Sequence, residues 1–96
     1  TAAYPAATAV GVAPGEPLAI VLLAGQAAPM AVENPRQTSA YRYPREYGPR
    51  PPAFARASLV PAGATEWLLI SGTASIVGHV SRHSGVREQV DETLAN

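Results

Sequence analysis

The 96-residue chain contains no cysteine, and its seven acidic residues balance seven basic ones, every one an arginine. Balanced charge argues against a nucleic-acid footprint and a polybasic membrane surface, and without cysteine the chain has neither disulfides nor thiolate metal sites. The apolar run 18–24 is too short for a bilayer, which needs about 20 residues. We expect one small domain with a modest core, cytoplasmic by default, without nucleic-acid or membrane partners.

Two strands are predicted near the N-terminus. Residues 6–12 alternate small and β-branched side chains, and residues 18–24 are rich in leucine, isoleucine and valine. Between them, Pro14 and Gly15 favour a type II turn, because proline fixes φ and glycine accepts a positive φ. The pattern therefore predicts a hairpin.

Residues 34–52 are predicted to be a long loop, because five prolines interrupt any helix there. The segment also carries three tyrosines and four arginines. Aromatic rings add nothing to a flexible linker, and a long loop inside a small domain is often functional. We therefore expect an ordered loop that binds a ligand.

A second hairpin and one helix are predicted after the loop. Residues 54–60 alternate, with Ala55 and Ala57 on one side and Arg56 on the other, and residues 66–71 return as an apolar strand. Extended chain continues over 72–78. Ser84 is then placed to cap an amphipathic helix that runs to the end of the sequence, with valine and leucine four residues apart on one face.

Two segments resemble the chorismatases, also described as pteridine-dependent deoxygenase-like proteins. They are residues 33–50 (ENPRQTSAYRYPREYGPR) and residues 69–79 (LISGTASIVGH). The resemblance implies an enzyme, of hydrolase or lyase type, that releases pyruvate and a dihydroxycyclohexadienoate or hydroxybenzoate from chorismate without metal or cofactor. It also implies an α+β, RidA/YjgF-like fold, a mixed sheet with a packed helix, built from two halves.

The resemblance covers essentially the whole chain but only the middle of a family member. It implies that residues 1–25 are the closing hairpin of a first RidA-like half. Residues 26–52 are then a connecting substrate-binding loop, and residues 53–96 are the opening strands and first helix of a second half. The chain begins without methionine and its last helix lacks a stop signal, so we expect an incomplete fold that packs with further chain or as a homo-oligomer.

Two departures from the family weaken the catalytic interpretation. The glutamate that the resemblance implies as general acid belongs to a later strand, so no catalytic residue is assigned in this chain. Where the family is expected to have Gly-His-Glu-Ser, this sequence has Val80 in place of the glutamate. The alternatives are a non-catalytic RidA-like subunit or binding module, and a fragment whose activity depends on a complementing chain.

A site for chorismate needs fixed donors for two carboxylates, which arginine and tyrosine supply. The candidates in the loop are Arg36, Tyr41, Arg42 and Tyr43; the simpler interpretation is that Arg36 caps a loop carbonyl and the tyrosines only pack. Along 71–75, the small residues Gly72 and Ala74 are expected to form a pocket wall, or else a strand thinned for helix packing.

A metal site is not predicted, since His79 and His83 have no evident third ligand.

Overall fold

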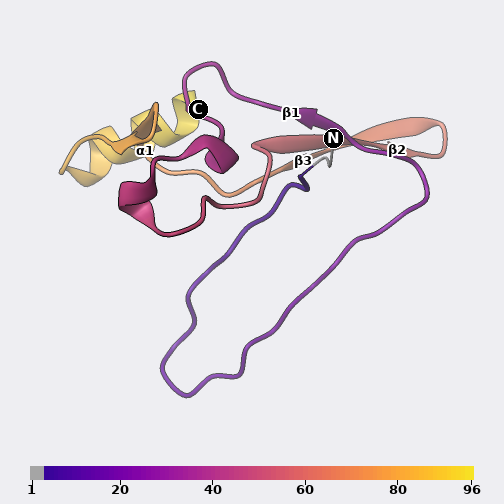
Figure 1. The fold of residues 1–96 in the computed structure, drawn as a ribbon, viewed down its shortest axis with the longest axis horizontal. Helices are drawn as coiled ribbons and strands as arrows, with labels where there is room; N and C mark the ends of the chain where they lie inside the picture. The colour runs from indigo at the N-terminus through magenta and orange to yellow at the C-terminus, as the bar shows by residue number, and fades with distance from the viewer. Residues whose placement is uncertain (1–3) are drawn as a thin grey trace.

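The computed structural model describes residues 4–96, and residues 1–3, the start of the expected first segment, lie outside that range. The described chain is a small α+β arrangement with antiparallel ladders and one helix (Figure 1). A three-stranded sheet has the order β1-β2-β3, and β4 pairs with β5 in a separate two-stranded ladder. The elements are β1 (Met30–Val32), β2 (Ala57–Ala62), β3 (Thr65–Ile70), β4 (Ile76–Val77), β5 (Val80–Ser81) and α1 (Val86–Ala95).

The second predicted hairpin is confirmed as β2 and β3. Their antiparallel register runs from Ala57 opposite Ile70 to Ala62 opposite Thr65, so the connection is a two-residue loop. Gly63, its first residue, has φ +64°, which a type II′ hairpin turn requires at that position. The sequence did not predict β1, a strand of only three residues that pairs its Met30 with Leu59.

The core lies where β2 begins and β3 ends, and it is built from small side chains. Ala40 and Ala55 are fully buried, and Ser58 and Ser71 are each 4% exposed. The Ser71 hydroxyl donates to the Ala55 carbonyl at 2.6 Å and accepts from the backbone N–H of Ala7 at 2.9 Å. Buried serines thus satisfy backbone groups that a regular ladder would otherwise pair.

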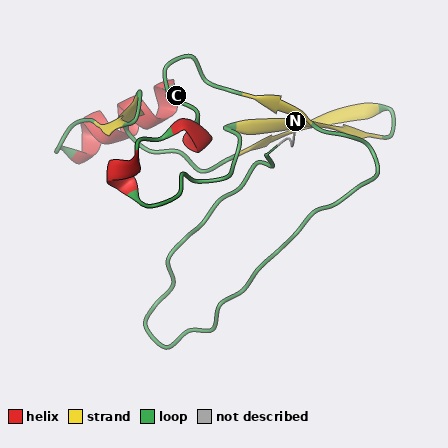
Figure 2. Ribbon diagram, in the orientation of Figure 1, coloured by secondary structure: helices red, strands yellow, loops and turns green. Residues whose placement is uncertain are grey.

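The first predicted hairpin is wrong as a pair of strands. Residues 9–28, here called the arm, form two irregular limbs that project from the sheet (Figures 1 and 2). Its turn is present, with Gly15 at φ +89° and the Glu16 N–H donating to the Ala13 carbonyl at 3.1 Å. The limbs do not pair, and Val21 is 94% exposed. A two-stranded hairpin is marginal in water unless another layer covers it, and every residue of the arm is exposed.

Helix α1 begins one residue later than expected, with Gly85 as its N-cap instead of Ser84. The Glu88 side chain folds back over Gly85 and occupies the place that a Cβ would need there. α1 lies beside β4 and β5, away from the three-stranded sheet (Figure 1). No α1 residue is buried, so the expected packed helix lies uncovered in this structure.

The expected mixed sheet appears only as two isolated parallel bridges, Ala6 with Ala55 and Gln37 with Gly78, because the named strands pair antiparallel. No helix within residues 4–96 combines the length and apolarity that a membrane crossing requires.

Candidate functional site

The predicted loop is ordered and folds back on the second half of the chain. It contains two short 3₁₀ turns, Ala40–Arg42 and Arg45–Tyr47. The Thr38 N–H donates to the Gly78 carbonyl at 2.8 Å, and the Gly78 N–H donates to the Arg36 carbonyl at 2.8 Å. These bonds lay the start of the loop against the segment before β5.

Arg56 lies directly before β2, and the loop packs against its side chain. It is 8% exposed, and its Nη2 donates to the Thr38 carbonyl and to the Tyr43 hydroxyl, each at 2.8 Å. Its guanidinium carbon lies 5.6 Å from the ring centroids of both Tyr43 and Phe54. Sequence reasoning placed Arg56 on the polar side of a half-buried strand and missed it; the available signal was a lone arginine between buried alanines.

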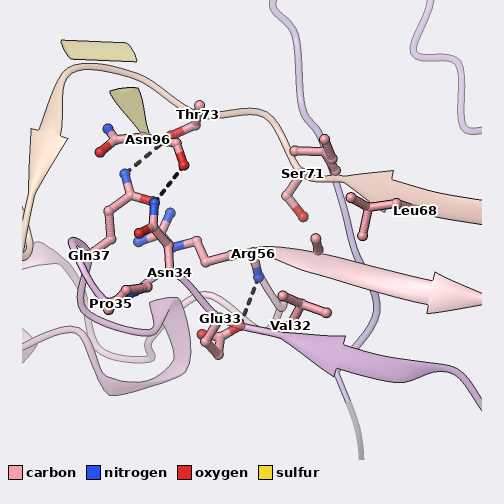
Figure 3. A pocket seen from close by; sticks show the side chains of 12 residues that line it. Val32, Glu33, Asn34, Pro35, Gln37, Arg56, Leu68, Ser71, Thr73 and Asn96 are labelled. Atoms are coloured by element: carbon pink, nitrogen blue, oxygen red, sulfur yellow. Dashed lines mark hydrogen bonds between the residues drawn. The ribbon is translucent and has the colours of Figure 1, made fainter. Parts of the chain in front are cut away.

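The Arg56 charge has no counter-ion in the described part of the chain. No carboxylate oxygen of residues 4–96 lies within 4.0 Å of its guanidinium nitrogens. Its Nε is buried without a hydrogen-bond partner. Glu33 is nearby, yet its Oε2 accepts from the backbone N–H of Arg56 at 2.9 Å, and its Oε1 is also buried and unpartnered (Figure 3).

Arg56 lies in the wall between two hollows, and Thr73 also lines both. The smaller one, the Asn34 hollow, encloses about 330 Å³. Figure 3 shows it crossed by hydrogen bonds from Asn34 to the carbonyl of Asn96 (2.7 Å) and from Gln37 to Thr73 (3.2 Å). Its lining residues are Val32, Glu33, Asn34, Pro35, Gln37, Arg56, Ala57, Leu68, Ile70, Ser71, Thr73 and Asn96.

The larger one, the Tyr43 hollow, encloses about 590 Å³ and is lined mostly by apolar and small side chains. Three residues predicted from the sequence meet here: Tyr43, Gly72 and Ala74. At Gly72 the Thr8 side chain comes so close that an added Cβ would lie 3.1 Å from its methyl carbon. The lining residues are Ala7, Thr8, Ala9, Val10, Tyr43, Pro52, Phe54, Arg56, Gly72, Thr73, Ala74 and Ile76.

The other predicted site residues, Arg36, Tyr41 and Arg42, line neither hollow. Arg36 pairs through Nη2 with Glu92 of α1, and its Nε donates to Asn96 Oδ1 at 3.1 Å. Tyr41 stacks on Tyr4 with centroids 4.9 Å apart, and the Arg42 guanidinium lies 5.9 Å from the Tyr41 ring centroid.

A second aromatic contact joins the loop to His79, the residue before β5. The Tyr47 hydroxyl donates to the His79 carbonyl at 3.0 Å and lies 3.1 Å from His79 Nδ1. The Tyr43 ring lies 5.7 Å from that of Tyr47 and 6.3 Å from that of His79. Val80, the departure noted above, is 42% exposed and lines neither hollow. Among residues 4–96, no group of three or more His, Cys, Asp or Glu side chains could hold a metal ion.

The chain was compared with known proteins, and no protein-family model matches it. It is 45% identical over 87 residues to a 3-hydroxybenzoate synthase from Streptomyces hygroscopicus, covering 85% of this chain and 25% of that protein. It is 43% identical over 98 aligned positions to a chorismatase from Streptomyces rapamycinicus, covering 99% of this chain and 29% of the relative. A chorismatase from S. hygroscopicus is 41% identical, with 99% of this chain and 28% of that protein covered.

The fold comparison agrees with the sequence comparison. A crystal structure of a chorismatase superposes with a TM-score of 0.68 at 42% identity, covering 74% of this chain and 22% of that one. The chain thus spans between a fifth and a third of the length of the relatives it matches. Together, the sequence identity and the shared fold support the chorismatase family for this chain.

Proposed function

We propose that this chain is the middle portion of a chorismatase-type enzyme and forms part of its chorismate-binding site. The observation that carries the proposal is 43% identity to a chorismatase over 99% of the chain. The Tyr43 hollow adds chemical support, since an apolar pocket with a few convergent polar groups suits a small polar ring. The names of the relatives do not favour the alternative of a non-catalytic subunit.

In this proposal the chain binds and orients the substrate, while the proton donor comes from elsewhere. Tyr43, Gly72 and Ala74 line the hollow. A fixed donor such as the Tyr43 hydroxyl would hold the substrate before proton transfer. The general-acid glutamate implied by the family resemblance has no counterpart among the residues assigned here. We therefore expect the isolated chain to release no pyruvate from chorismate above a heat-treated control.

The division of the chain into parts of two RidA-like halves belongs to the same proposal. It assigns residues 1–25 to a first half, 26–52 to the substrate-binding connection and 53–96 to a second half. The ordered connection supports this division, because it folds onto residues of the third segment such as Arg56 and Gly78.

A chimera tests the proposed function. Residues 1–96 would replace the matching stretch of the S. rapamycinicus chorismatase, and conversion of chorismate would be followed by pyruvate release. Retained conversion is expected, because the replaced stretch is similar along its whole length. A chimera that folds as the parent does but neither binds nor converts chorismate would refute the proposal.

The same chimera tests the assignment of Arg36 as a carboxylate ligand. Arg36→Ala should raise KM by a factor that corresponds to a loss of about 1.5–3 kcal/mol in binding free energy, the range for charge-assisted hydrogen bonds. Because Arg36 pairs with Glu92 in this structure, Glu92→Gln is the matched variant. If Arg36 acts only by tethering α1, both variants should show the same defect, whereas a ligand role predicts a defect for Arg36→Ala alone.

A further inference from the structure

We propose that Gln37 and Asn96 are positioning residues for the Tyr43 hollow. Their side-chain amides, here called the amide clamp, donate to residues 73–76, and three of those four residues line the hollow. The sequence analysis assigned neither amide to the site. The effect of the clamp on chorismate binding rests on the proposed function, whereas the clamp itself follows from the hydrogen bonds of this chain.

The first argument is that the clamped segment has little regular backbone pairing of its own. Residues 71–75 belong to no strand. The Ile76 N–H donates to the Ala74 carbonyl at 2.8 Å, which folds the chain into a three-residue turn. A backbone carbonyl that is shielded from water without a donor is destabilising, so the carbonyls of this segment need donors from elsewhere in the chain.

The second argument is that the clamp supplies such donors. Gln37 Nε2 and Asn96 Nδ2 both donate to the Ile76 carbonyl, at 3.2 and 3.0 Å. Asn96 Nδ2 also donates to the Ala74 carbonyl at 2.9 Å. Gln37 Nε2 also donates to the Thr73 hydroxyl at 3.2 Å (Figure 3). Each amide thus uses both of its N–H protons, and the Ile76 oxygen uses both of its lone pairs.

The third argument is that the Gln37 amide is itself held in place. Gln37 is 8% exposed. Backbone hydrogen bonds of 2.8 Å join Gly78 to both of its neighbours, Arg36 and Thr38. Because the backbone on each side of Gln37 is fixed and its side chain is buried, holding its two acceptors costs little further conformational entropy.

Asn96 connects the loop, the helix and the clamped segment. Its backbone N–H donates to the Glu92 carbonyl at 3.2 Å, which closes the last turn of α1. Its carbonyl accepts from Asn34 Nδ2 at 2.7 Å, and its Oδ1 accepts from Arg36 Nε at 3.1 Å. The same side chain donates to residues 74 and 76. A change at Asn96 should therefore shift the loop and the clamped segment relative to each other.

The clamp acts on binding through the residues that it holds. Thr73, Ala74 and Ile76 line the Tyr43 hollow, and the two clamp residues do not. Misplacement of a site by about 1 Å can lower its activity on the order of a hundredfold, even when the substituted residue lies outside the site. Loss of a clamp amide should therefore change the fit of the hollow to its ligand.

The first measurement needs no substitution, so it stands even if a variant fails to fold. It follows hydrogen exchange of side-chain NH₂ protons by NMR in the 96-residue chain. The protons of Gln37 and Asn96 should exchange at least about tenfold more slowly than those of Gln26, an exposed residue of the arm, because hydrogen-bonded protons exchange only when the structure opens.

The second measurement uses variants of the chimera. Gln37→Met keeps the side-chain length and removes both donors, and Asn96→Asp removes both donors but keeps the acceptor for Arg36. Each should raise the KM for chorismate by roughly threefold to thirtyfold, with a smaller change in kcat. Gln89→Met is the matched control, because it removes a hydrogen bond from α1 to the carbonyl of His83 instead. Its KM should stay within about twofold of the parent value.

A purely structural role predicts a different result. The variants would then lower Tm and the yield of folded enzyme, while the KM of the enzyme that remains folded would equal that of the parent. Clamp protons that exchange as fast as those of Gln26, or an unchanged KM in both folded variants, would overturn the proposal and leave the proposed function standing.

A parent chimera that folds but does not convert chorismate would refute the proposed function and not the clamp. The clamp is then tested by the methyl resonances of Ala74 and Ile76 in the 96-residue chain. These resonances should shift in both Gln37→Met and Asn96→Asp and stay in place in Gln89→Met. Methyl resonances that do not move in either clamp variant would overturn the proposal.

Discussion

The hairpin β2–β3 and the arm of residues 9–28 begin from similar sequences and have different structures. Both contain apolar β-forming residues on either side of a glycine turn with positive φ, at Gly63 and Gly15. Strand β2 of the hairpin also pairs with β1, and the buried Ser71 hydroxyl forms hydrogen bonds with the backbone of Ala7 and Ala55. The arm keeps only its turn. Strand propensity therefore produces a strand here only where a neighbouring segment satisfies the backbone and covers the side chains.

The largest difference in stability between the hairpin and the arm is expected when a small residue is replaced by a larger one. Ala55→Leu, at a fully buried position beside β2, should lower the free energy of unfolding by about 1–3 kcal/mol through overpacking. Ala19→Leu, in the exposed arm, should change it by less than about 0.5 kcal/mol. Urea denaturation measures both, and an equal loss from the two variants would show that the arm is packed.

The two glycine turns offer a closer comparison, because nothing lies within 4 Å of a Cβ added at either Gly63 or Gly15. Gly63→Ala should cost about 1–2 kcal/mol, the penalty for a left-handed conformation, because the paired strands prevent the turn from relaxing. Gly15→Ala should cost almost nothing, since the unpaired limbs can change conformation freely. Thermal unfolding distinguishes them, and a matching drop in Tm would mean that the arm is held as firmly as the hairpin.

The smallest effect on stability, and the largest on association, is expected from the arm surface. Leu18, Val21 and Leu22 are 86%, 94% and 87% exposed, and exposed apolar strand-forming segments promote association. The purified chain should therefore sediment as concentration-dependent oligomers at micromolar concentration. Val21→Lys should shift it toward monomer while leaving the free energy of unfolding within about 0.5 kcal/mol. A monomeric parent chain would contradict this expectation.

Local chemistry was enough to predict several parts of the molecule. The β2–β3 hairpin has alternating residues with a glycine at its turn, and the helix has apolar residues at helical spacing. The ordered loop was indicated by tyrosines and arginines that a linker would not carry. Tyr43, Gly72 and Ala74, three of the site residues that the family resemblance suggested, line one hollow, and their part in binding stays a prediction.

Two predictions failed for the same reason: an alternating sequence pattern does not show which other segment will pack against the strand. The sequence of 18–24 looks like a buried strand, yet in the structure it is exposed. Arg56 looks like an outward-facing residue of a half-buried strand, yet the loop covers it. Arg36 is not one of these errors: it contacts Glu92 of α1 and Asn96, about sixty positions away in the sequence, and its role as a ligand contact stays a prediction.

What the sequence determined by itself was therefore local: where the chain turns, where a helix forms, and which loop is rich in tyrosine and arginine. Those properties depend on φ preferences, side-chain periodicity and residue chemistry within a few positions. Only the tertiary structure decided that Arg56 becomes a buried cation with an unpartnered Nε, and that the arm remains unpaired. Burial and pairing depend on which distant segments meet, here the loop at Thr38 and Tyr43 with the start of β2, and no local pattern encodes that meeting.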